Sequence, residues 1–187
     1  MAEFTSYEPN VVEVMGEVIN SFAMAFPEEL RDFGRAALNR HGLRDAAANR
    51  FYRAQTFLDA LREVTQRGGR NVMTRIGEGI ALRVALPPEW DNLQAALEGL
   101  DRAYHSKYRG GKIGNRSYQH EGMSRGLVHV RVMSTNHYCC AFDRGVLEGL
   151  AKRFRPTGIT DVLVRHEDSE PCRKMGGDSC TYVISWG

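Results

Sequence analysis

A change of hydrophobic period at Gly110-Gly111 constrains the fold of this 187-residue chain more than any other feature. Before these glycines, apolar residues recur every three or four positions, as they do along one face of a helix. After them, Val128, Val130 and Val132 alternate with other residues, which is typical of a half-buried strand. We therefore expect an α+β fold, in which an N-terminal helical part is followed by an antiparallel sheet with one crossing helix.

The individual elements can be assigned from the same patterns. Five helices are expected. The first begins near Val11, the second runs from Pro27 to Gly42 and the third covers 48–66. A short fourth helix passes through Val72, and the fifth begins at Pro87-Pro88. In the second part, strands are expected over 113–121, 128–133, 159–166 and 181–186, with a helix over 143–154. The chain has no repeat or polar linker, so residues 1–187 should form one domain. Its mostly helical part would cover 1–108 and its sheet part 109–187.

Composition excludes several classes of protein. The chain is 42% hydrophobic and 26% charged, which is ordinary for a soluble globular protein and unlike a disordered chain or a coiled coil. The chain contains no run of ~18 apolar residues, so the sequence predicts no membrane-spanning helix. The net charge of +2 does not indicate a nucleic-acid partner, and the basic stretch over 101–125 is more typical of a solvated surface. The first ten residues lack a signal peptide's basic and apolar regions, so we expect a cytoplasmic protein.

Four cysteines near the C-terminus are the most informative side chains. Disulfides are rare in the cytoplasm, and Gly176-Gly177 supplies a turn that brings Cys172 and Cys180 face to face. Such a thiol pair is half of a tetrahedral zinc site. Candidates for the remaining ligands are Cys140, His166, Glu167, Asp168 and Glu170. Functionless buried thiols and a reversible disulfide remain open alternatives, whereas no acid or amide orients His137 to activate a catalytic cysteine.

The run from Glu167 to Val183 resembles the end of the vinyl-4-reductase domain, a small-molecule-binding module of bacterial sensors of aromatic compounds and of archaeal proteins. The resemblance implies a structural zinc ion held by three cysteines and an acidic residue. Cys172 and Cys180 match two of these cysteines, and Cys140 takes the place of the third. The fourth ligand would be Glu170, Asp168 or His166.

Most of the remaining chain resembles the haem-nitric oxide/oxygen-binding (H-NOX) sensors. Their Leu-Asp-x-x-His motif carries the proximal haem ligand, and here Leu100-Asp101 is followed by Tyr104 at the ligand position and His105 one residue later. A shift by one residue turns a side chain ~100° around a helix. The family's Tyr-x-Ser-x-Arg clamp for the haem propionates appears as Val132-Met-Ser134-Thr-Asn136, which keeps only the serine.

Together, these features predict a small-molecule-sensing domain with an apolar pocket and a structural zinc site. The ligand would be a small hydrophobic or aromatic molecule, and a signal would pass to a partner protein or through a homodimer. The pocket would lie between the helices and the sheet, lined by residues that are equally compatible with a plain core: Phe57, Leu61, Ile76, Trp90, Leu97 and Tyr104.

Two alternative functions follow from the resemblances. The first is a divergent haem-based gas sensor that uses His105 or Tyr104 as the iron ligand. The second is an enzyme acting on tetrapyrrole-like substrates. The chain has no recognisable nucleotide loop or acid/base pair for that chemistry, so we expect a binding domain and not an enzyme.

Overall fold

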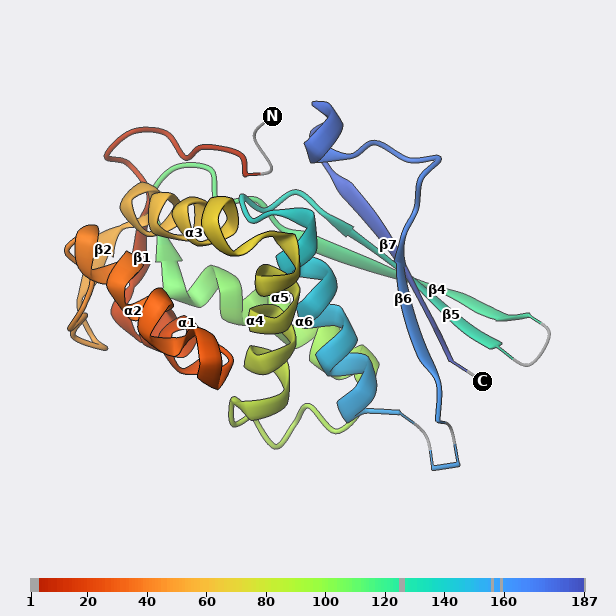
Figure 1. The fold of residues 1–187 in the computed structure, drawn as a ribbon. Coiled ribbons are helices and arrows are strands. Elements are labelled where there is room, and N and C mark those ends of the chain that lie inside the picture. Colours follow the sequence, from red (N-terminus) through yellow and green to blue (C-terminus); the bar gives the residue numbers. More distant parts are fainter. Residues whose placement is uncertain (1–3, 125–126, 156, 159, 187) are drawn as a thin grey trace.

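The protein is described by a computed structural model over residues 4–124, 127–155, 157–158 and 160–186, with the backbone alone over 118–129. Figure 1 shows the helical part on one side of the molecule and a twisted sheet on the other, which confirms the predicted α+β class. The helices are α1 (Gly16–Ala25), α2 (Arg31–Arg40), α3 (Ala54–Gly68), α4 (Arg70–Arg83), α5 (Leu93–Lys107) and α6 (Cys140–Arg153), with short 3-10 helices η1 (Glu28–Leu30) and η2 (Arg173–Met175). The strands are β1 (Glu13–Met15), β2 (Phe51–Arg53), β3 (Tyr108–Arg109), β4 (Arg116–Ser124), β5 (Leu127–Ser134), β6 (Val162–His166) and β7 (Cys180–Trp186).

The larger sheet is antiparallel with strand order β4-β5-β7-β6, and one of its faces packs against α6. Val132 pairs with Tyr182, while Val130 and Val164 both pair with Ile184, so apolar side chains from three strands share one face. All five are buried. The Tyr182 hydroxyl donates a hydrogen bond to the carbonyl of Cys140 at 3.1 Å, which ties β7 to the first residue of α6.

A second, smaller sheet in the helical part was not predicted. Its strand order is β2-β1-β3, and Val14 pairs with Tyr52 on one side and with Tyr108 on the other. The helices predicted from Val11 and from Ala48 therefore start later, at Gly16 and Ala54. Valines and aromatic residues at these positions favour extended backbone, but strands of two or three residues are too short to show an alternating period.

Two further helix boundaries were predicted wrongly by a few residues. After Pro27 the chain forms η1 before α2 begins at Arg31. The helix expected directly after Pro87-Pro88 begins at Leu93, because the Asn92 side chain caps it by accepting a hydrogen bond from the Ala95 amide at 2.9 Å.

In the sheet part, β4 begins at Arg116, not at residue 113, since Gly114 has a φ of 75° that no strand residue adopts. The strand expected over 159–166 begins at Val162, and Ile159 lies outside the described residues.

Glycines allow α4 and α6 to pack with their backbones in contact. A Cβ atom on Gly145 would lie 2.0 Å from the Thr74 carbonyl oxygen, and one on Gly77 would lie 2.4 Å from the Phe142 carbonyl oxygen. On α6, Gly149 follows Gly145 by four residues and faces Ala81 and Glu78 of α4. This contact fixes where α6, and therefore Cys140, sits relative to the helical part. In the described part of the chain, no helix is both long enough and apolar enough to span a bilayer.

Gly145→Ala is expected to destabilise the protein by about 1–3 kcal/mol, the usual cost of overpacking a close contact. The sign is diagnostic, because alanine in an ordinary helix interior is about 1 kcal/mol more favourable than glycine. Urea unfolding followed by circular dichroism measures the change. Exposed Ala36 of α2 provides the control, since Ala36→Gly should cost only the propensity difference. A Gly145→Ala protein more stable than wild type would contradict the backbone contact.

Candidate functional site

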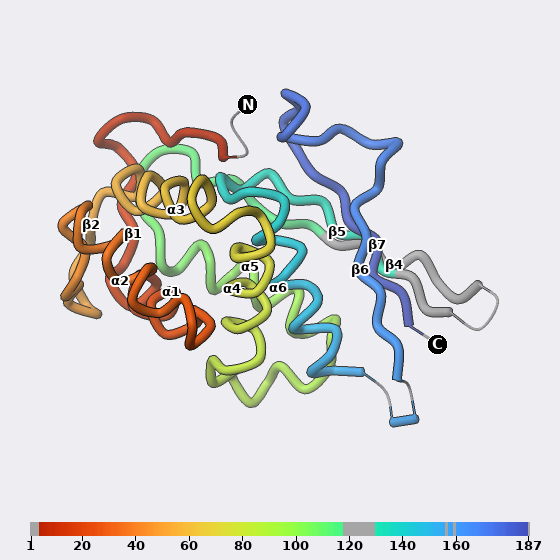
Figure 2. Tube along the Cα trace, in the orientation of Figure 1, coloured from red at the N-terminus to blue at the C-terminus, as the bar shows by residue number. Residues whose placement is uncertain are grey.

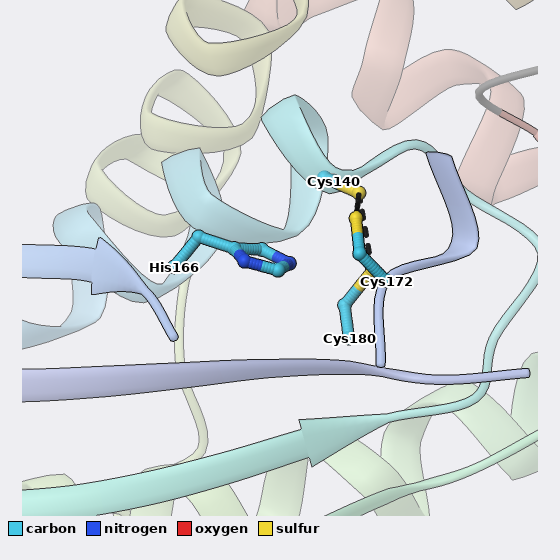
Figure 3. A group of neighbouring side chains, drawn as sticks. All are labelled: Cys140, His166, Cys172 and Cys180. Carbon is cyan, nitrogen blue, oxygen red and sulfur yellow. Dashed lines mark hydrogen bonds between the residues drawn. The ribbon is translucent and has the colours of Figure 1, made fainter. Parts of the chain in front are cut away.

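Three cysteine sulfurs and one imidazole lie together where the β6–β7 connection reaches the beginning of α6 (Figure 3). The blue end of the tube in Figure 2 shows the course of this connection from β6 to β7. Cys140 is the first residue of α6, His166 the last of β6 and Cys180 the first of β7, while Cys172 lies in the connection. Their four ligand atoms lie within 4.8 Å of one another. The cluster therefore joins one helix, two strands and a loop.

The predicted glycine turn explains how Cys172 reaches this cluster. The Cys172 carbonyl accepts hydrogen bonds from the amides of Met175 at 2.8 Å and Gly177 at 2.9 Å. Gly176 closes the turn with a φ of 91°, a left-handed conformation that glycine adopts without strain. The chain is thereby reversed over a few residues, and Cys172 and Cys180 both come to lie beside Cys140.

The spacing of the sulfurs suits a tetrahedral metal ion. Zinc–sulfur bonds are about 2.3 Å long, so two sulfurs on one tetrahedral zinc ion lie about 3.8 Å apart. The Sγ atoms of Cys140 and Cys172 are 3.7 Å apart, and those of Cys140 and Cys180 are 3.1 Å apart. Cys140, Cys172 and Cys180 are not joined by disulfide bonds. A small adjustment of Cys180 would bring the three sulfurs to three corners of one tetrahedron.

His166 points its ring toward the sulfurs (Figure 3). Its Nε2 atom is buried and has no hydrogen-bond partner among the described residues. A buried polar atom without a partner is costly, and a metal ion would satisfy it. The other ring nitrogen, Nδ1, lies 3.9 Å from the exposed Asp168 carboxylate, which is too far for a direct hydrogen bond.

Arg173 is a further hydrogen-bond partner of Cys180. Its guanidinium is buried, and its Nε donates to the Cys180 sulfur at 3.3 Å. The hydrogen bond from Cys140 and, after it, the charge of Arg173 lower the pKa of the Cys180 thiol, against the effect of burial. The same hydrogen bond, followed by burial, raises the pKa of Cys140. Both effects favour the thiolate form of Cys180, the form in which cysteine binds metals.

Arg173 also belongs to a buried ionic cluster around Asp143, which we call the Asp143 cluster. Arg173 Nη2 donates to Oδ2 of Asp143 at 2.7 Å, and Arg116 Nη2 donates to Oδ1 at 2.8 Å. Ser134 and Asn136 donate to the same carboxylate. Burial acts to raise the pKa of Asp143, but attraction to the two arginines and these hydrogen bonds outweigh it and lower the pKa.

Glu170, another predicted metal ligand, lies outside the group of four. Its carboxylate pairs with Arg131 at 3.2 Å. Glu170 and Asp168 do line a wider cavity of about 720 Å³ that also reaches Cys140, Cys172 and His166, so the cluster is accessible from solvent. Cys139 is fully buried one residue before α6 and is not one of the four.

A second cavity, of about 380 Å³, lies between α1, α5, α6 and the segment after α4. Its wall is mainly apolar and aromatic, with Phe22, Trp90 and Phe142 among the lining residues. Of the six residues predicted to line a pocket, Trp90 and Tyr104 do so. The other four, Phe57, Leu61, Ile76 and Leu97, are buried but do not line this cavity. We call it the apolar cavity.

The two predicted haem-ligand candidates point in different directions from α5. Tyr104 is buried and its hydroxyl donates to the carbonyl of Ile113 at 2.5 Å. Burial raises the pKa of Tyr104 to about 12. The His105 side chain is 47% exposed, lies 3.7 Å from Asp101 and is not among the residues lining the apolar cavity. Ser134 and Asn136, at the positions compared with the propionate clamp, instead bind Asp143.

Several polar residues of this region were not predicted from the sequence. The Asp143 cluster draws on Arg116 and Arg173, and a group of buried tyrosines surrounds Tyr104: Tyr7, Tyr108 and Tyr138. One signal was available. Asp143 precedes Val146, Leu147 and Leu150 by three, four and seven residues, so helical spacing puts its carboxylate on the apolar face.

Comparison with known proteins places this geometry in a structural class. No protein-family model matches the chain, and no curated protein matches it. A variant of the unliganded Fe(II) H-NOX protein from K. algicida superposes with a TM-score of 0.60 at 11% identity, covering 92% of this chain and 96% of that one. This chain has the H-NOX fold.

Other solved structures agree. An oxygen-binding H-NOX domain related to soluble guanylate cyclases gives a TM-score of 0.58 at 11% identity, over 91% of this chain and 93% of that chain. A structure whose description concerns haem redox potential and protein-induced porphyrin distortion also superposes with a TM-score of 0.58 at 11% identity. The match covers 92% of this chain and 98% of that chain. Identities this low establish the fold alone. The likeness of the C-terminal run to the vinyl-4-reductase domain stays a prediction.

Proposed function

We propose that this chain is a small-molecule-sensing domain of the H-NOX fold, which binds its ligand in the apolar cavity and holds a structural zinc ion with Cys140, His166, Cys172 and Cys180. The observation that carries the metal assignment is the unpartnered, buried Nε2 of His166 beside three converging sulfurs. Four protein ligands leave no open coordination position, so the ion stabilises the fold and performs no chemistry.

The zinc ion would fasten the β6–β7 connection to the beginning of α6. Apart from the metal, contacts of the connection include its own turn, the hydrogen bonds of Arg173 to Asn136 and Asp143, and the Glu170–Arg131 pair. α6 contributes Phe142, Val146 and Leu150 to the wall of the apolar cavity. The metal would therefore help to fix one wall of the ligand site.

Native mass spectrometry of the freshly purified protein, without chelators, tests both parts of the proposal. We expect a mass increment of one zinc ion per chain, together with any retained small molecule. The same spectrum reports the oligomeric state. Zinc well below one ion per chain would rule out the structural metal site. A zinc-loaded protein to which no small molecule binds would rule out the sensing function.

Haem is the second candidate ligand, and the similar solved structures favour it because their descriptions name haem or the Fe(II) and oxygen-bound states of H-NOX proteins. The residues of this chain fit haem poorly. The described residues that line the apolar cavity include no histidine, and the neutral Tyr104 phenol donates its proton to Ile113. We therefore rank a haem-free ligand first and assign no role to haem.

Adding haem to the purified protein separates the two candidates. For the haem-free domain we expect no saturable Soret band shift, in the wild type or in a Tyr104→His variant that restores the motif's spacing. A stoichiometric Soret band in the wild type that disappears in Tyr104→Phe or His105→Ala would instead establish the haem sensor.

The other expectations from the sequence stay predictions: a single domain over 1–187, a binding protein and not an enzyme, a cytoplasmic location, a homodimer and a signalling partner. The proposal itself concerns only the ligand of the apolar cavity and the zinc ion of the metal cluster.

A further inference from the structure

One end of the apolar cavity carries hydrogen-bond donors. Arg116 lines the cavity with a side chain that is only 7% exposed, and its guanidinium carbon lies 5.3 Å from the centre of the Tyr104 ring. A guanidinium has five N–H donors. Among the described residues, the Arg116 guanidinium has one side-chain acceptor, Oδ1 of Asp143 at 2.8 Å, which leaves N–H groups at the cavity wall without an acceptor.

Two tyrosines at the same cavity add another donor. The hydroxyls of Tyr108 and Tyr138 hydrogen-bond to each other, and both residues line the cavity. Each phenol has one proton, so only one of the two O–H groups is used in this bond. The Tyr108 hydroxyl also interacts with that of Tyr7, so Tyr138 is the phenol of the pair that can offer its proton to the cavity. By contrast, the Tyr7–Tyr104 pair is satisfied, because Tyr104 donates to the Ile113 carbonyl.

The formal charges nearby leave room for an anion. Arg116 and Arg173 share the single carboxylate of Asp143, and Arg173 has the Cys180 sulfur as a further partner. At the cavity's margin, Lys107 and Glu17 pair with each other at 2.7 Å and cancel. Among the described residues that line the cavity, Arg116 is thus the charged group without its own full counterion.

We infer that the apolar cavity binds a small monocarboxylic acid with an apolar body, whose carboxylate is held by Arg116 and the Tyr108–Tyr138 hydroxyl pair. Phe22, Trp90, Phe142 and Val146 would surround the apolar body. A buried carboxylate needs charge-assisted hydrogen bonds, which a guanidinium fork and a phenol supply. The inference rests on the proposed function, because it names the ligand class of that same cavity.

Fluorescence titration with matched probes tests the inference. Trp90 lines the cavity and reports binding in a Trp186→Phe background. 4-Phenylbutyrate, with an aromatic body, and octanoate, with an alkyl body, are compared with 4-phenylbutanol and octanol. We expect each acid to bind about tenfold or more tightly than its alcohol, since hydrogen bonds to charged groups are among the stronger ones. The two acids together show which body the cavity prefers.

Arg116→Lys, Tyr138→Phe and the exposed control Arg102→Met complete the test. Lysine keeps the positive charge beside Asp143, so Arg116→Lys should fold even if Arg116→Met does not. Zinc content and circular dichroism verify the folding. We expect Arg116→Lys and Tyr138→Phe to weaken binding of the acids about tenfold while leaving the alcohols unchanged, and Arg102→Met to change neither.

Equal affinity for acids and alcohols, or acid binding unaffected by both cavity variants, would overturn the carboxylate inference and leave the proposed binding function standing. If no acid binds, the inference is wrong. Native mass spectrometry then decides separately whether the cavity holds another ligand.

Discussion

The Cys180→Ser variant is expected to purify with far less than one zinc ion per chain and to lose more than about 4 kcal/mol of its free energy of unfolding. Cys180 is fully buried, its sulfur lies 3.1 Å from that of Cys140, and Arg173 donates a hydrogen bond to it. A serine hydroxyl does not replace a thiolate as a zinc ligand. Structural zinc contributes apparent binding free energies of about 10–16 kcal/mol, which become folding free energy. Elemental analysis and urea unfolding measure the two effects.

Matched variants assign the individual ligands. Cys139→Ser changes a buried cysteine next to the cluster and should keep a full zinc ion, which separates metal loss from general damage to the core. His166→Ala should lose zinc, whereas Glu170→Gln should keep it because Glu170 pairs with Arg131. If Cys180→Ser retains zinc and the wild-type unfolding midpoint, the cysteines are not a structural site. Zinc loss in Glu170→Gln alone would reassign the fourth ligand.

The cluster was largely predictable because its signals are local. Cys172 and Cys180 flank a glycine turn, and Cys140 starts a helix whose apolar spacing is clear. The sequence left His166 and Glu170 as equal candidates for the fourth metal ligand, yet the two-residue period of a strand distinguishes them. His166 follows Val162 and Val164 by steps of two on β6, so all three point toward α6, whereas Glu170 lies beyond the end of the strand.

The apolar cavity was much less predictable, since periodicity identifies a buried face and not a void within it. Phe57 and Leu61 of α3 have the same helical spacing as true lining residues, but they pack into the core. The one-residue shift between Tyr104 and His105 had a clear consequence. Because neighbouring helical positions differ by ~100°, Tyr104 enters the cavity and His105 faces solvent.

Asp143 lies between the two sites, and its replacement is expected to have the second large effect. Asp143→Asn keeps the shape of the side chain but leaves the buried guanidinium group of Arg116 without a counterion and that of Arg173 with only the Cys180 sulfur. Removing one partner of a buried ion pair costs about 3–5 kcal/mol. Glu78→Gln is the control, because its pair with Lys152 has a similar 2.7 Å length but is partly exposed and should contribute less than about 1 kcal/mol.

The pH dependence of this effect follows from the direction of the shift. Attraction to the arginines, exceeding the opposite effect of burial, lowers the pKa of Asp143 in the folded protein below its ordinary value of about 3.9. The unfolded chain therefore binds this proton first as the pH falls, so the stabilisation is complete above about pH 5 and declines toward the lowered folded pKa. The difference in unfolding free energy between wild type and Asp143→Asn should be about 1 kcal/mol smaller at pH 3 than at pH 5. Any loss of zinc in acid affects both proteins and largely cancels in this difference. A difference that grows as the pH falls through this range would show that Asp143 is not held ionised by its arginines.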